Sequence, residues 1–345
     1  MKRTLYLGLT PSGTSAGDRR RFLYYSKQRK MDLAKASDKN VACVVAAENW
    51  DLSMIRPKYP GTPIVYDLID AYLIRDNFVD DYLRSIVKTS TGQIKPTLLP
   101  YSKVVARNCK IADAVVCSSV EQKELILRFN SNVHVILDSH DEFPLMDFRK
   151  NRTGPSNIFW EGLPFTLPSI GRYLEAFQRL GSERKAKINF LTDEHYFKYL
   201  GRFGRTNTKQ QNLSMLQELG CDFSFVKWSL DNVIRFAMES LVGLVPINVE
   251  SPFQRLKPEN RMLIMWRLGL PCLVSSTPSH SRVSLETQLQ NTFSDSDSLY
   301  AKLVHLIDDF DAQQDNVKRG QSYLADYHNL GVFLSSWDKV LASVV

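Results

Sequence analysis

No stretch of this 345-residue sequence approaches the roughly 20 consecutive apolar residues that are needed to cross a bilayer. Cysteine is scarce, and its five residues are scattered, which indicates neither a disulfide framework nor a zinc site and is typical of a reducing compartment. The six histidines show no metal-ligand spacing, and no Walker loop, GxGxxG or GxSxG motif is present. We therefore expect a cytoplasmic protein that is not an integral membrane protein and that holds no metal and no cofactor.

Positive charge is in excess, with 44 Lys and Arg against 37 Asp and Glu, for a net charge of +7. This favours anionic partners without distinguishing among them. The charge is concentrated in residues 18–35, DRRRFLYYSKQRKMDLAK, which we predict to be one helix with Phe22, Leu23 and Tyr25 inward. Its basic face is either simply solvated or in peripheral contact with an anionic membrane surface at the inner face of the membrane. Aromatic residues fall at core-like spacings rather than between Lys and Arg, so we expect no nucleic acid partner.

Apolar strand patterns alternate with helical patterns along the whole chain. Strands that are apolar on both faces and separated by helices predict a parallel sheet covered on both sides. The pattern stops in the charged and Pro- and Gly-containing stretch 140–157, which we interpret as a linker, and then starts again. The sequence thus predicts an α/β protein with two tandem Rossmann-like domains and an interdomain cleft, the first over residues 1–145 and the second over 155–325. A last helix, 329–345, is expected to pack back on the first domain.

The stretch 256–276, LKPENRMLIMWRLGLPCLVSS, places polar residues in front of an apolar helix that we predict over 258–268, with Pro258 in its first turn. The body of this helix is apolar nearly all round, so we expect it to be buried with only its start accessible. A helix N-terminus attracts anions, and Lys257 and Arg261 add positive charge there. The alternative is that KPEN merely caps the helix.

The order of an acidic-aromatic loop, KPENR, an apolar helix, Gly-Leu-Pro and a strand resembles the donor-binding half of GT-B glycosyltransferases, especially the retaining nucleotide-sugar-dependent group. Four other segments are similar to that family in the same order: VYDLID (65–70), ADAVVCSS (112–119), NIFWEG (157–162) and FVKWSLDNVIRFAMESLVGLVPI (225–247). The resemblance covers roughly residues 1–285, and the final helices fit the closing helices of that fold.

The resemblance implies roles for particular residues. Donor binding would fall to two groups, Lys257, Glu259, Asn260 and Arg261 at the diphosphate and ribose, and Glu161, Gly162, Lys227 and Trp228 around the diphosphate and base. Ser12 and Gly13 would border the transferred sugar and the acceptor. Asp70 and His140, with Asp141 beside them, are the catalytic candidates of the first domain, whereas Asp67 is predicted to cap the turn after its strand.

The family's pair of glutamates would fall on Leu256 and Ile264, so that pair is absent, and Glu250 and Glu259 are its nearest substitutes. The resemblance implies a transferase for polysaccharide biosynthesis that moves a sugar from a nucleotide-sugar donor to a hydroxyl of a saccharide or lipid-linked acceptor. Two alternatives stay open: a sugar-nucleotide epimerase of the same fold, and a non-catalytic nucleotide-sugar-binding subunit.

Overall fold

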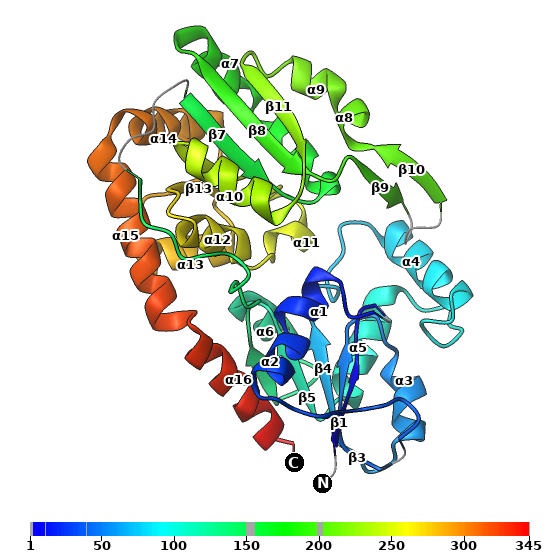
Figure 1. Cartoon of the computed structure of the whole chain (residues 1–345). Coiled ribbons are helices and arrows are strands. Elements are labelled where there is room, and N and C mark those ends of the chain that lie inside the picture. The colour runs from blue at the N-terminus through cyan, green and yellow to red at the C-terminus, as the bar shows by residue number, and fades with distance from the viewer. Residues whose placement is uncertain (1–2, 11, 39, 150–155, 199–202, 345) are drawn as a thin grey trace. The chain divides into compact units, whose positions relative to one another are not determined.

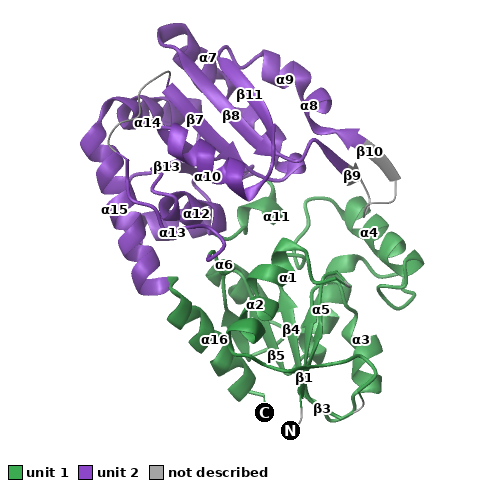
Figure 2. Ribbon diagram, viewed as in Figure 1, with its two compact units in different colours: residues 1–140, 251–258, 328–345 green, residues 141–250, 259–327 purple. Residues whose placement is uncertain are grey.

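A computed structural model of the chain describes residues 3–10, 12–38, 40–149, 156–198 and 203–344 (Figure 1). The chain divides into two compact units, which Figure 2 shows in different colours. Unit 1 comprises Met1–His140, Ser251–Pro258 and His328–Val345, and unit 2 comprises Asp141–Glu250 and Glu259–Tyr327. Each unit contains a six-stranded sheet in which all pairs are parallel, so the prediction of an α/β protein with two Rossmann-like domains is confirmed. Of the expected linker, residues 150–155 lie outside the described residues.

The sheet of unit 1 is built from apolar strands whose alternate side chains enter two different cores. Val44 and Ala46 of the third strand pack with Val104 on one face, while Cys43 and Val45 pack on the other. Its strand order is β2 (Leu33–Ala34), β1 (Arg3–Leu7), β3 (Val41–Ala47), β4 (Ile64–Leu68), β5 (Ala114–Cys117) and β6 (Val133–Val135). The order reverses between β1 and β3, and such a reversal opens a ligand-binding crevice at the carboxyl ends of the strands.

Helices cover both faces of this sheet. One face lies under α3 (Leu52–Ile55), α5 (Tyr101–Ile111) and α6 (Val120–Ile126). The other lies under α2 (Phe22–Gln28) and the last helix, α16 (Leu330–Ala342), whose Trp337 is fully buried 5.2 Å from the ring of Phe22.

The sheet of unit 2 repeats this arrangement. Its order is β11 (Asp222–Lys227), β8 (Ala186–Thr192), β7 (Ser156–Glu161), β12 (Val242–Val245), β13 (Cys272–Ser275) and β14 (Thr292–Phe293), with the reversal between β7 and β12. Helices α7 (Leu174–Glu183) and α14 (Ser296–Asp308) pack on one face. On the other, α10 (Leu230–Glu239) contacts β7 and β8, and α12 (Asn260–Arg267) contacts β12 and β13.

The remaining elements connect these layers. They are α1 (Ala16–Arg20), the 3-10 segments η1 (Arg56–Lys58) and η2 (Pro164–Tyr173), α4 (Phe78–Ser90), the antiparallel pair β9 (His195–Lys198) and β10 (Phe203–Asn207), α8 (Thr208–Gln211), α9 (Leu213–Gln217), α11 (Pro252–Arg255), α13 (Pro278–Glu286) and α15 (Phe310–Tyr327). Among the helices described, none is both long and apolar enough to cross a membrane.

The predicted single helix over 18–35 is wrong. The chain forms α1 and α2, separated at Arg21, whose backbone leaves the helical region with φ −120° and ψ −122°, and then continues into β2. Phe22 and Tyr25 are buried as expected, while Leu23 is only half-buried. The break follows from Arg21 itself, because its side chain is fully buried in an ion-pair network beneath the helices.

Candidate functional site

In unit 2, several predicted donor residues gather at the carboxyl ends of the strands, next to the reversal in strand order. Strand β7 ends at Glu161, and the indole Nε1 of Trp228, just after β11, donates to its Oε1 over 2.9 Å. Gly162 follows, and a Cβ there would lie 2.9 Å from the Trp160 ring and 3.0 Å from Nη1 of Arg261. Only a glycine therefore leaves room for both side chains. Lys227 is exposed at the end of β11.

Arg261 reaches this place from the start of α12. Its Nη1 donates to the backbone oxygen of Glu161 over 3.2 Å. Burial lowers the pKa of Arg261, and the Glu161 carboxylate opposes that shift. The predicted start of the helix is two residues too early, because α12 begins at Asn260 with Glu259 as its N-cap, so Pro258 precedes the helix and does not occupy its first turn. Its apolar body is buried as expected.

The two glutamates considered as substitutes for the family's pair differ in environment. Glu259 is almost fully buried, and its Oε1 accepts from Nη2 of Arg282 over 3.0 Å. Glu250 is exposed and forms an ion pair of 2.5 Å with Arg172. Lys257 belongs to the segment 251–258 of unit 1, so the KPENR motif is divided between the units. That segment also forms the short helix α11 where the sequence indicated a loop.

Three polar atoms near the ends of these strands are buried without a hydrogen-bond partner in the described part of the chain: Oγ1 of Thr192, Oδ1 of Asn260 and Nε2 of His280. Buried polar atoms are nearly always paired, so these three atoms are available to hydrogen-bond a ligand or water. The other ring nitrogen of His280, Nδ1, lies 2.8 Å from the backbone oxygen of Ser275, to which it donates. Burial lowers the pKa of His280 to about 4, and Arg261 adds to the shift. Sequence reasoning missed His280, although it follows the polar turn SSTPS after a strand.

In unit 1, the loop after β1 that contains Ser12 and Gly13 is organised by the buried Asp18. Its carboxylate accepts from the backbone N–H of Leu9 over 2.7 Å and from that of Thr10 over 3.1 Å. Gly13 has a φ of +66°, a conformation that favours glycine, and the Ser12 and Thr14 hydroxyls hydrogen-bond over 2.8 Å. The loop thus has a defined shape at the carboxyl end of β1.

Asp67 does not cap a turn as predicted. Its carboxylate is buried and accepts from Nε of Arg21 over 3.0 Å and from Nη2 over 2.6 Å. Burial raises the pKa of Asp67, and Arg21 opposes that shift. Asp67 is therefore a structural partner of Arg21.

Asp70, after β4, lies beside a carboxyl group that the sequence analysis missed. The backbone N–H of Asp70 donates to Oε2 of Glu48 over 2.8 Å, and its own Oδ2 accepts from the Tyr72 hydroxyl over 3.3 Å. Burial, and next the charge of Asp70, raises the pKa of Glu48 to about 8. The signal was available in the sequence, since Glu48 follows a buried strand just as Asp70 does.

His140 is buried in unit 1, whereas Asp141, the first residue of unit 2, pairs with Arg267 over 3.1 Å.

Replacing Asp70 with asparagine is expected to lower turnover at least about tenfold, or about 1.4 kcal/mol, with nucleotide affinity little changed. The substitution keeps the shape of the side chain and removes the charge, which the resemblance to glycosyltransferases implies is catalytic. Steady-state rates and nucleotide titrations on the same preparations measure this, with Asp80→Asn on the exposed surface of α4 as the control. Unchanged turnover in Asp70→Asn would show that Asp70 has no catalytic role. Lost nucleotide affinity in this variant would indicate that Asp70 binds the nucleotide-sugar donor.

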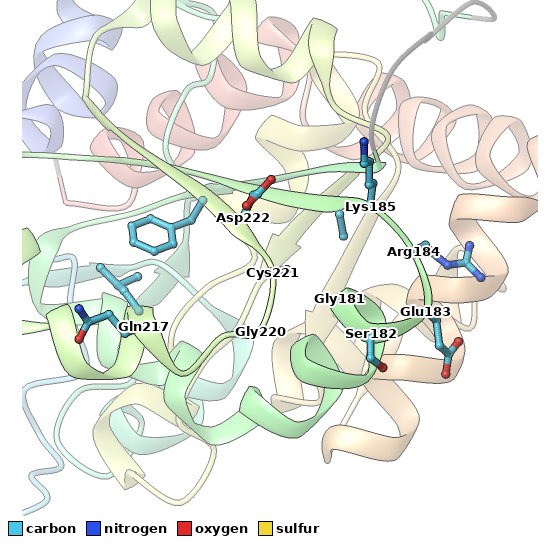
Figure 3. A pocket seen from close by; sticks show the side chains of 12 residues that line it. Gly181, Ser182, Glu183, Arg184, Lys185, Gln217, Gly220, Cys221 and Asp222 are labelled. Carbon is cyan, nitrogen blue, oxygen red and sulfur yellow. The ribbon is translucent and has the colours of Figure 1, made fainter.

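A separate open hollow of about 530 Å³ lies at the other ends of the strands of unit 2 (Figure 3). It is lined by the starts of β8 and β11, and the side chains of Glu183, Arg184 and Lys185 point in different directions around it. Arg184 is already paired with Asp308 over 2.5 Å. The hollow therefore lacks converging polar groups and is not the candidate site. In the described part of the chain, no three His, Cys, Asp or Glu side chains are placed to hold a metal ion.

Comparisons with known proteins bear on the fold. No family model matches the chain, and no curated protein matches it. Among solved structures, a variant of TarM from S. aureus in complex with fondaparinux, alpha-GlcNAc-glycerol and UDP is 10% identical with a TM-score of 0.61, covering 94% of this chain. HepE of Anabaena in complex with UDP is 10% identical with a TM-score of 0.62, covering 93% of this chain and 81% of HepE. WaaG, a glycosyltransferase involved in lipopolysaccharide biosynthesis, is 12% identical with a TM-score of 0.56, covering 98% of this chain and 84% of WaaG.

These likenesses establish the class of fold. The chain has the two-domain GT-B fold of glycosyltransferases over nearly its whole length, so the resemblance inferred from the sequence is confirmed at the level of fold. The chain spans 58% of the length of TarM.

Proposed function

We propose that this protein is a glycosyltransferase that moves a sugar from a nucleotide-sugar donor to a hydroxyl of a saccharide or lipid-linked acceptor. The observation that carries the proposal is the cluster at the carboxyl ends of the unit 2 strands, where Arg261, Gly162 and Trp228 meet around Glu161. Open parallel sheets bind their ligands at such a reversal in strand order. UDP is present in the solved structures of TarM and HepE, which supports a nucleotide donor.

Each group has a chemical task in this proposal. The Arg261 guanidinium, together with the positive end of the α12 dipole, stabilises the negative charge of the departing nucleotide diphosphate. Gly162 lets the diphosphate approach the backbone, and the unpaired polar atoms of Asn260 and His280 receive hydrogen bonds from the donor. In unit 1, Asp70 and the loop with Ser12 and Gly13 hold the acceptor. The net charge of +7 favours an anionic acceptor or peripheral contact with an anionic membrane surface.

Replacing Arg261 with alanine is expected to weaken nucleotide diphosphate binding about 10- to 100-fold, since a hydrogen bond to a charged group contributes about 1.5–3 kcal/mol. Calorimetric titration of the whole chain with UDP, GDP and ADP measures the affinity, and thermal unfolding checks that the fold is retained. Arg179→Ala is the matched control, because Arg179 lies in the same unit and forms an exposed ion pair with Asp297.

The outcomes separate the alternatives. Unchanged affinity in Arg261→Ala, or no nucleotide binding by the wild type, contradicts the proposed site. Nucleotide-sugar binding with isomerisation or hydrolysis in the absence of an acceptor identifies an epimerase. Tight binding without any turnover identifies a non-catalytic subunit.

A further inference from the structure

Helix α4 of unit 1 has its polar face inward and its apolar face outward. Its buried residues are Asp81, Ser85 and Lys88, which recur at helical spacing on one side. The large apolar residues on its surface are exposed: Phe78, Val79, Leu83 and Ile86. A helix that covers a protein core normally buries its apolar stripe, so this reversed pattern calls for a reason other than core packing.

Three cations lie over aromatic rings at the inward face of α4. Arg84 and Lys88 belong to the helix, and Arg75 precedes it. The guanidinium carbons of Arg75 and Arg84 lie 4.3 Å and 4.9 Å from the centre of the Tyr72 ring. Nζ of Lys88 lies 4.8 Å from the centre of the Tyr101 ring. Burial, and then the charge of Arg84, lowers the pKa of Arg75 and lowers that of Lys88 to about 8. The three positive charges therefore repel one another.

Neighbouring groups neutralise these cations only in part. Nε of Arg75 is 3.4 Å from Oδ1 of Asp81, but the Asp81 carboxylate already accepts from the backbone N–H and the hydroxyl of Ser102. Nη2 of Arg75 is buried and has no hydrogen-bond partner among the residues that the structure describes, and Nζ of Lys88 donates to the neutral amide of Gln93.

The charges of Arg84 and Glu48 also bear on how far the three cations are neutralised. Within the described ranges, Arg84 has neither a hydrogen bond nor an ion pair. Burial, and next the charge of Asp70, raises the pKa of the nearby Glu48 to about 8, which reduces the counter-charge that Glu48 offers these cations. Gathering like charges costs stability, so the arrangement indicates a ligand of opposite charge.

We propose that Arg75, Arg84 and Lys88 form a binding site for a phosphate group carried by the acceptor. Guanidinium groups bind phosphate oxygens in two-point fashion, and a buried lysine adds a point charge. The Tyr72 ring beneath both guanidinium groups carries the hydroxyl that donates to Asp70, so a phosphate held here places the rest of an acceptor beside Asp70. The phosphate site stands on the cations alone, whereas its assignment to the acceptor rests on the proposed function.

Two sources can supply such a phosphate, the headgroup of a lipid and a water-soluble phosphorylated saccharide or alditol. The exposed apolar face of α4 favours the lipid, because Phe78, Leu83 and Ile86 of the same helix can enter the interface of a bilayer. The experiment therefore contains an arm for each source.

The test measures binding of inorganic phosphate and glycerol phosphate to the whole chain by calorimetry, and binding of phosphatidylglycerol vesicles by co-sedimentation. Wild-type protein is expected to bind phosphate, and Arg84→Gln to bind it at least about tenfold more weakly. Arg84 is half-exposed, so the variant should retain its fold, which thermal unfolding verifies. Lys103→Ala on α5 removes an equal charge from an exposed position and is expected to leave the affinity within about twofold.

Arg261→Ala separates this site from the donor site, and phosphate binding should be unchanged in it. Vesicle binding that depends on Arg84 identifies the lipid source, and glycerol phosphate binding without vesicle binding identifies the soluble one. No phosphate binding by the wild type, or equal affinity in Arg84→Gln, overturns the inference even if nucleotides bind. Phosphate binding that depends on Arg84 in a chain that binds no nucleotide upholds the site and rejects the proposed function.

Discussion

Replacing Arg21 with alanine is expected to lower the free energy of unfolding by about 3–5 kcal/mol, the usual effect of removing one partner of a buried ion pair. The Arg21 side chain is inaccessible to solvent and binds Asp67 in two-point fashion. It also donates to the backbone oxygen of Ile136 over 2.8 Å and pairs with Asp138 over 3.2 Å. The alanine variant leaves the buried Asp67 carboxylate without its cation, and burial then raises the pKa of Asp67 further.

Urea unfolding of the whole chain, followed by circular dichroism, measures this effect. Arg29→Ala is the control, because Arg29 forms an exposed ion pair with Asp338, and the loss of an exposed pair changes stability little. Adding Asp67→Asn to Arg21→Ala should recover part of the loss, since it removes the stranded charge. A loss below about 1 kcal/mol in Arg21→Ala, or no recovery in the double variant, would show that water reaches the Asp67 site.

The second large effect is a loss of stability of unit 2 in acid that depends on His280. Burial holds the pKa of His280 near 4, against 6.5 for an ordinary histidine, so the unfolded chain takes up this proton at a higher pH than the folded one. The stability associated with neutral His280 is complete above about pH 6.5 and is lost as the pH falls towards 4. The loss is on the order of 3 kcal/mol, because each unit of pKa shift corresponds to about 1.4 kcal/mol.

Other groups titrate in this range, so the measurement compares wild type with His280→Gln. The difference in unfolding free energy between pH 7 and pH 4 should be smaller in the variant by that amount. His305→Gln, at an exposed histidine, is expected to follow the wild type. Parallel pH profiles for wild type and His280→Gln would contradict the assignment.

The framework of the fold could be predicted because strands buried on both faces form uninterrupted apolar runs, such as 41–47 and 242–249, that stand out in the sequence. The error at 18–35 arose because DRRRF is typical of a solvated helix face. Only the partners Asp67 and Asp138, distant along the chain, make Arg21 a core residue. Periodicity carries no information about such long-range pairing.

The position of a candidate residue was predictable where the residue stands at a strand end, as for Glu161, Trp228 and Asp70. It was not predictable where it depends on the orientation of a helix. The pattern of α4 has the expected helical period, but the period alone does not reveal that Lys88 and Asp81 face inward. The surroundings of Arg84, Lys88 and His280 depend on residues distant along the chain, so only the structure shows them.

The place of α16 in unit 1 determines the order in which the chain can fold during synthesis. Phe333, Trp337 and Val340 complete a core that begins with Phe22 and Cys43, so one face of the unit 1 sheet is covered by α2 alone until α16 has been translated. All residues of unit 2 have been translated once Tyr327 is added, so unit 2 can complete its fold before unit 1 does. The nascent chain therefore exposes an apolar surface throughout translation of unit 2, and a premature stop before α16 yields a folded second unit attached to an aggregation-prone first one.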